Sequence, residues 1–157
     1  MNNFLKIHQL SARFDGAISQ WGGAVLLLVL HCYVAWQFFH AGLIKIQNWP
    51  GTLELFQSEY HVPVLPPELA AYLGAGGELF FPCLLITGLF ARPAAVGLFF
   101  VNAMAVISYP QLFEFECPAA INDHFYWSIL LVTVFTFGAG RFSLDGILKD
   151  KATKSSV

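Results

Sequence analysis

The strongest constraint on this chain is the long uncharged stretch that separates Asp15 from Lys45. No Asp, Glu, Lys or Arg occurs between these residues, and residues 24–49 read AVLLLVLHCYVAWQFFHAGLIKIQNW. A helix needs about 20 apolar residues to cross the hydrocarbon core of a bilayer. We therefore expect residues 24–49 to form a membrane-spanning helix. Pro50 should end it, because proline removes a helical hydrogen-bond donor.

The composition agrees with a membrane protein. The 157 residues are 57% hydrophobic and 11% charged, whereas soluble domains carry about 25% charged residues. The formal net charge is −2, so the chain lacks the basic surface that nucleic acids require. The first apolar run is longer than the roughly 7–15 residues of a signal-peptide core, so we expect it to be retained. The lipid bilayer is the first expected partner, and nucleic acid is not one.

Three further apolar segments follow, and together they predict the fold class. The chain is expected to be an all-α integral membrane protein, a bundle of four transmembrane helices with a short surface helix in the first outer loop. Proline and glycine punctuation bounds these segments. The expected later elements are a surface helix at Thr52–Tyr60 and spans at about Glu68–Phe90, Pro93–Tyr109 and His124–Gly140.

The chain divides into three regions on this interpretation. Residues 1–23 form a cytoplasmic or interfacial segment, which Gly22 and Gly23 should break from the first span. Residues 24–140 form the membrane domain, and residues 141–157 form a polar cytoplasmic tail that should fray.

The distribution of charge predicts the orientation. With four spans, one side of the membrane receives all the basic residues but Lys45. Because cytoplasmic loops are enriched in Lys and Arg, both termini are expected in the cytoplasm of a multi-pass plasma-membrane protein. The basic residues on that side are Lys6, Arg13, Arg92, Arg141, Lys149, Lys151 and Lys154.

Glu78 is the most unusual residue of the predicted spans. A carboxylate near the middle of a span costs about 2.5–3.5 kcal/mol, so an ionisable residue there is a functional candidate. Lys45 is the fixed cation on the same outer side, and we expect the two to pair. His40 lies five residues before Lys45, and these three are the candidate catalytic residues. A purely structural ion pair that clamps two helices is an equal alternative.

Four residues are candidates for holding a cofactor. Trp36 precedes His40 by one helical turn, so the two share a helix face. His124 and Trp127 open the fourth span, and Asn102 is the polar residue inside the third. His31 lies on the opposite side of the first span from His40, so both cannot serve one site.

These residue types favour a quinone over a metal. A quinone head needs hydrogen-bond donors, an acidic group for proton exchange and aromatic walls. The metal-binding candidates His40, His61, His124 and Cys117 lack ligand spacing, so no metal site is predicted, and haem or copper are weaker alternatives. The sequence has no GxGxxG, CxxCH or cluster-type cysteine run to carry its own electrons.

Three short segments resemble the DoxX family of small four-helix bacterial inner-membrane proteins. The resemblance covers about Trp36–Ala95, and the closing GAGRFSLDGIL also fits. It implies a bacterial inner-membrane location. It also implies an association with quinone-linked oxidoreductases, or with metal-stress gene products. The segments are AG..K at Ala41, Gly42 and Lys45, EL..P at Glu78, Leu79 and Pro82, and GL..R at Gly88, Leu89 and Arg92.

The favoured hypothesis is a redox component that exchanges electrons with membrane quinone alongside partner proteins. This would make the chain a subunit of a quinone-linked oxidoreductase. The alternatives are a non-enzymatic membrane partner, a protein that handles metal or small solutes, and a structural assembly subunit. The sequence leaves open the substrate, the oligomeric state and the roles of Cys32, Cys83 and Cys117.

Overall fold

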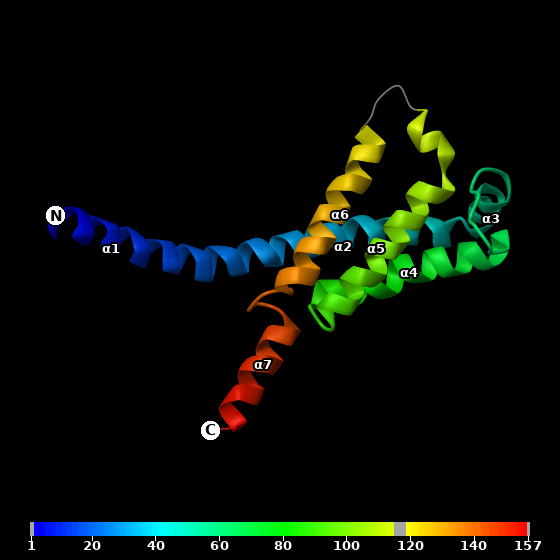
Figure 1. The fold of residues 1–157 in the computed structure, drawn as a ribbon. Coiled ribbons are helices and arrows are strands. Elements are labelled where there is room, and N and C mark those ends of the chain that lie inside the picture. The colour runs from blue at the N-terminus through cyan, green and yellow to red at the C-terminus, as the bar shows by residue number, and fades with distance from the viewer. Residues whose placement is uncertain (1, 115–118, 157) are drawn as a thin grey trace.

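The structure is a computed structural model that describes residues 2–114 and 119–156, which form helices and their connections (Figure 1). The elements in chain order are α1 (Asn2–Ala17), the π-helical turn η1 (Ile18–Gly22), α2 (Gly23–Gln47), α3 (Trp49–Ser58), α4 (Pro67–Thr87), α5 (Ala91–Ser108), the 3-10 turn η2 (Pro110–Phe113), α6 (Ala119–Phe137) and α7 (Leu144–Ser155).

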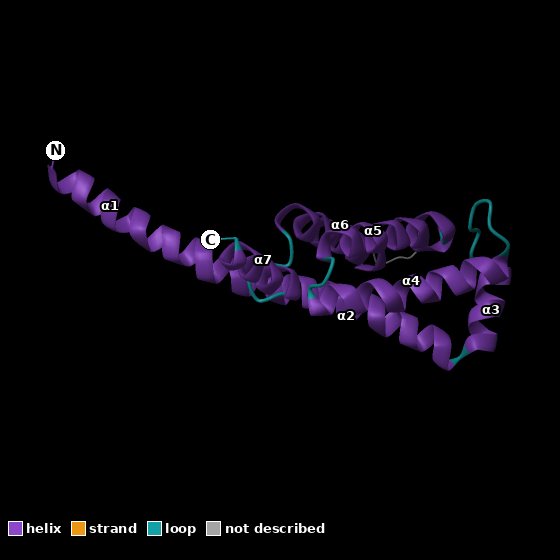
Figure 2. Ribbon diagram, turned by 90° about the horizontal axis from the view of Figure 1, so that it is seen from below, coloured by secondary structure: helices purple, strands orange, loops and turns teal. Residues whose placement is uncertain are grey.

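Helices α2, α4, α5 and α6 form the body of the molecule. Helix α2 packs along α4, α5 packs along α6, and α4 also contacts α5 (Figures 1 and 2). Within residues 2–114 and 119–156, three helices are long and apolar enough to cross a membrane: Ile18–Gln47, Pro67–Thr87 and Ala91–Ser108. The expected helical fold is present, and three of the four expected spans meet this criterion.

Many large apolar side chains of these helices lie on the outside. The core is instead rich in alanine, which lets helices approach closely. A soluble protein rarely exposes so many large apolar side chains, so this surface suits helices surrounded by lipid. Exposed examples are Leu26 and Val29 of α2, Phe80 of α4, Phe100 and Ile107 of α5, and Val132 and Phe135 of α6.

The first helices form one nearly continuous rod. Helix α1 extends the line of α2 away from the body of the molecule (Figure 1). The expected break at Gly22 and Gly23 was wrong, because the chain passes through the π-helical turn η1 without leaving the helical path. A glycine costs a helix interior only about 1 kcal/mol, which the neighbouring turns can offset.

The end of the first span differs slightly from the expectation. Helix α2 ends at Gln47, and Asn48 adopts a non-helical conformation with φ −129° and ψ 68°. The Asn48 side chain accepts a hydrogen bond from the Gly51 N–H at 3.3 Å and caps α3. Pro50 therefore sits in the first turn of α3, where its missing N–H costs nothing, and Asn48 ends the span.

The start of α5 is tied to the tail of the chain. The Asp145 carboxylate accepts hydrogen bonds from the Phe90 N–H at 3.0 Å and the Ala91 N–H at 2.9 Å. Gly88 has φ +65°, and a Cβ there would lie 2.3 Å from Cβ of Ser143. The tail, which was expected to fray, forms helix α7, and Ser143 caps its N-terminus by accepting from the Gly146 N–H at 3.1 Å.

Candidate functional site

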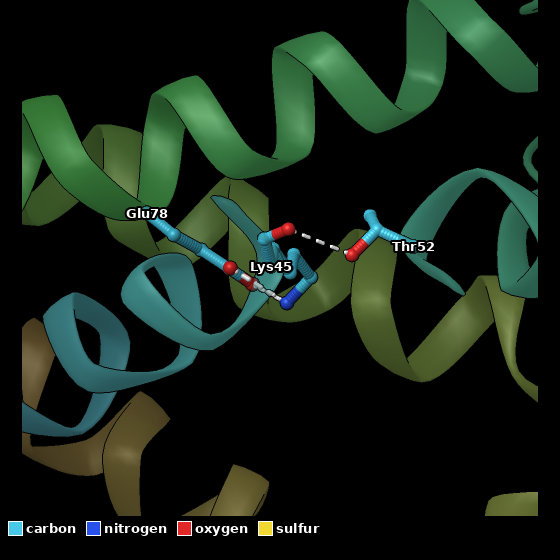
Figure 3. A network of polar contacts seen from close by, with 3 residues as sticks. All are labelled: Lys45, Thr52 and Glu78. Carbon is cyan, nitrogen blue, oxygen red and sulfur yellow. Dashed lines mark hydrogen bonds and ion pairs between the residues drawn. The ribbon is translucent and has the colours of Figure 1, made fainter. Parts of the chain in front are cut away.

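Lys45 and Glu78 form a buried ion pair between α2 and α4 (Figure 3). The Lys45 Nζ atom donates to Glu78 Oε1 at 2.8 Å and to Oε2 at 2.6 Å. The two side chains are 17% and 10% exposed, respectively. The pairing expected from the sequence is thus present. A two-oxygen contact at this depth holds both charges where apolar surroundings would otherwise exclude them.

Gly42 allows α2 and α4 to pack closely beside the ion pair. A Cβ on Gly42 would lie 2.9 Å from Cγ of Leu79 and 3.1 Å from Cβ of Glu78. Only a residue without a side chain lets α2 approach α4 this closely. The first two segments of the family resemblance therefore meet in space, and their meeting positions the ion pair.

The short helix α3 fixes the end of α2 beside this pair. The Thr52 hydroxyl donates to the backbone carbonyl of Lys45 at 2.9 Å (Figure 3). This carbonyl belongs to the last turn of α2, which has no helical partner of its own. The buried Thr52 therefore secures the backbone that carries the lysine side chain.

A cavity of about 360 Å³ adjoins the ion pair and is lined by residues from α2, α3, α4 and α5. Its walls are mostly apolar, and Lys45 and Glu78 supply charge at one place in them. Leu73 and Phe100 line the cavity and are also exposed on the outer surface of α4 and α5. The cavity is therefore open to the surroundings of the bundle.

Two polar residues of this cavity were missed from the sequence. The Ser108 hydroxyl is buried without a hydrogen-bond partner, and Tyr60 contributes a phenol. Burial, followed by the negative charge of Glu78, raises the pKa of Tyr60 above its usual value. The sequence gives little indication that Ser108 is buried, because a serine at a helix end usually faces solvent. Its burial comes from the loop after α3, whose His61 N–H donates to the Ser108 carbonyl at 2.7 Å.

Trp36 and His40 lie apart from this cavity. Their rings stack with centroids 6.2 Å apart, as one helical turn allows. Trp36 is 54% exposed, and His40 is also exposed. Neither residue lines the cavity beside Glu78. The face that they share was expected, but it points out of the bundle.

Asn102, His124 and Trp127 form a second polar cluster between α5 and α6. The Asn102 amide donates to the His124 carbonyl at 2.8 Å and to the Ser128 hydroxyl at 2.9 Å. His124 Nδ1 donates to the side-chain Oδ1 atom of Asn102 at 2.7 Å. Trp127 packs edge-on against His124 and against Phe38 of α2. This network joins α2, α5 and α6, and none of its residues lines the cavity beside Glu78.

His31, Cys32 and Cys83 belong to neither the cavity beside Glu78 nor the Asn102 cluster. His31 is fully buried, and its Nδ1 lies 2.6 Å from the Leu27 carbonyl. Cys32 and Cys83 are both free thiols. Among the described residues, no three His, Cys, Asp or Glu side chains gather as metal ligands would. Cys117 lies outside the described residues.

The comparisons with known proteins place the chain in a family. The DoxX family matches residues 26–110, which is more than half of the 157 residues. The chain belongs to the DoxX family. The matched region of this DoxX protein runs from α2 to η2 and contains both members of the ion pair.

One curated relative extends the match beyond that region. The chain is 32% identical over 133 residues to an uncharacterized protein of Haemophilus influenzae, covering 82% of this chain and 86% of the relative. No solved structure matches the chain. The resemblance seen in the sequence is confirmed. DoxX membership and the apolar helices identify a membrane protein.

Proposed function

We propose that this DoxX protein binds a membrane quinone in the cavity beside the ion pair of Lys45 and Glu78. The observation that supports this most is the buried, unpartnered hydroxyl of Ser108 in a largely apolar wall. A buried hydroxyl without a partner loses about 1–3 kcal/mol, which a ligand oxygen recovers. Ligand pockets combine apolar walls with a few polar groups in this way.

The chemistry of a quinone fits these groups. Each of its two carbonyl oxygens accepts a hydrogen bond, and the Lys45 ammonium, the Ser108 hydroxyl and the Tyr60 phenol are donors. Its apolar tail can leave through the open side of the cavity along the exposed Leu73 and Phe100. A water-soluble substrate would gain nothing from that apolar exit.

Reduction of a quinone to a quinol takes two electrons and two protons. The sequence has no GxGxxG or CxxCH motif for an electron carrier, and in this proposal a partner protein supplies the electrons. Glu78 is the carboxyl group that lines the cavity, and it exchanges protons with the bound head group. His40, expected from the sequence as a third catalytic residue, faces away from the cavity and is left out of this proposal.

We also propose a membrane topology with four spans. Helix α6 is the fourth span, antiparallel to α5, and both termini lie in the cytoplasm of a bacterial inner membrane. The excess of Lys and Arg at the α1, α4–α5 and α7 ends supports this orientation. Lys45 and the ligand cavity then lie toward the outer side.

Equilibrium binding of a short-chain benzoquinone to the purified protein tests this function. Ser108→Ala should weaken binding about 5- to 10-fold, because it removes one hydrogen-bond donor. The matched control is Ser58→Ala, since Ser58 is exposed and its hydroxyl bonds only within α3. Absence of saturable binding, or equal affinities of the two variants, would contradict the proposal.

A further inference from the structure

A second cavity lies at the opposite end of the helical bundle from the ion pair and shares no lining residue with the first cavity. It has a volume of about 580 Å³ and forms where α5 begins, where α6 connects to α7, and where η1 passes. In Figure 1 the start of α5 and the connection from α6 to α7 lie below the crossing of α2 and α6. Unlike the first cavity, its walls carry several charged side chains.

Three cations from three different segments line this cavity. Arg92 comes from the first turn of α5, Arg141 from the connection after α6, and Lys149 from α7. Arg92 Nη2 donates to the Thr136 carbonyl at 3.3 Å, which leaves its other donors free for a ligand. All three side chains are exposed, so an anion can reach them.

The carboxylates of this cavity do not cancel that charge. Asp145 is committed to the Phe90 and Ala91 N–H groups at the start of α5. Asp150 remains as an exposed acid on α7. The three cations outnumber the two carboxylates, so the lining keeps a net positive charge and favours an anionic ligand.

Exposed aromatic side chains surround the charges. Trp21 is 56% exposed, and its ring lies 5.1 Å from the Arg141 guanidinium carbon. Phe142 packs near Trp21 and is 45% exposed, and Phe137 lines the cavity and is 69% exposed. Exposed Trp beside Lys and Arg is typical of the level where lipid head groups meet hydrocarbon. A soluble anion would use the cations and leave these rings without a partner.

We propose that this cavity binds the phosphate group of an anionic phospholipid, whose acyl chains lie against the exposed aromatic rings. Arg92, Arg141 and Lys149 hold the phosphate, and Trp21 holds Arg141 in place. This site is independent of the quinone cavity. The phosphate chemistry is shared with inorganic phosphate, so the experiment separates the two sources.

Thermal unfolding of the full chain in detergent micelles measures this binding. Phosphatidylglycerol should raise the melting temperature, whereas phosphatidylcholine and inorganic phosphate at the same concentration should not. Lys149→Gln should weaken phosphatidylglycerol binding about 5-fold, and Arg141→Gln with Lys149→Gln about 25-fold, at roughly 5-fold per cation. The matched control is Lys151→Gln, which removes the same charge from α7 outside the cavity.

The results distinguish a specific phospholipid site from nonspecific binding of lipid or phosphate. A loss with Lys149→Gln and none with Lys151→Gln supports the site, even where the Arg141 variant fails to fold. Equal stabilisation by phosphatidylcholine, equal losses in the two lysine variants, or stabilisation by inorganic phosphate alone would overturn it.

Discussion

The Glu78 carboxylate is largely buried, and its charge is compensated there by Lys45. Removing one member of a buried ion pair leaves an uncompensated charge and costs about 3–5 kcal/mol. Replacing both members by uncharged residues of similar size is often nearly neutral. This difference separates a structural role for the pair from a functional one, because a ligand site needs the charges themselves.

We expect Glu78→Gln and Lys45→Met each to lower stability, and the double variant to recover most of the loss. Glu78→Gln leaves the Lys45 ammonium unpaired beside an apolar cavity, whereas the double variant leaves no charge. Thermal unfolding in one detergent measures all three variants, and benzoquinone binding is measured on the double variant. A stable double variant that binds quinone like the native chain would assign the pair a structural role.

Tyr60 provides a test that depends on pH. Because burial and the charge of Glu78 raise its pKa, the phenol stays protonated beyond the usual titration range of tyrosine near 10. Its contribution to stability is therefore present below that range and is lost as the pH rises through the raised pKa.

Tyr60→Phe should reduce the high-pH step in an absorbance titration of tyrosinate, which is the absorbance that appears above the usual titration range of tyrosine. Tyr126→Phe, which removes an exposed tyrosine from α6, is the control that should keep this step. Glu78→Gln should move the step to lower pH, because it removes a nearby negative charge. An unchanged titration in Tyr60→Phe would contradict the buried position of the Tyr60 phenol in the cavity wall.

At the scale of elements, the segments of the family resemblance mark the helix contacts. Gly42 packs on Leu79 and Glu78, and Gly88 packs on Ser143. These contacts require residues without side chains, because a Cβ would collide with atoms of the neighbouring segment. Two segments of the family pattern therefore coincide with close contacts of the bundle.

We expect Gly42→Ala to destabilise the protein by about 1–3 kcal/mol, the usual cost of overpacking. The added methyl group meets Leu79 and Glu78, so it should also weaken quinone binding. Gly76→Ala is the matched control on α4, since nothing lies within 4 Å of its added Cβ. Thermal unfolding of the two variants compares them, and equal melting temperatures would contradict the packing.

The sequence predicted the helical segments well, because apolar runs bounded by proline and glycine define them. It also predicted the contact of Lys45 with Glu78, because opposite charges in apolar spans must pair. It could not predict the cap by Asn48 or the burial of Ser108, which depend on where other segments lie. The shared face of Trp36 and His40 was real, but periodicity alone cannot tell which way a face points in lipid.

At the scale of the molecule, the number of spans decides which segments share a side. If α6 crosses the membrane, α3 and α7 lie on opposite sides, whereas three spans place them on the same side. We expect Glu54→Cys to react with a membrane-impermeant thiol reagent from outside intact cells, and Lys151→Cys only after permeabilisation. Both changes are made in a chain without its native cysteines. Labelling of both positions from outside would exclude four spans.

The most direct test of the account is photolabelling with an azidoquinone, mapped by peptide mass spectrometry. We predict labelled peptides from α4 and α5 that contain the cavity residues between Leu73 and Phe81 and between Gly97 and Ser108. Excess unlabelled quinone should abolish this labelling. Labelling confined to the outward face of Trp36 and His40, or unaffected by excess quinone, would contradict the central claim.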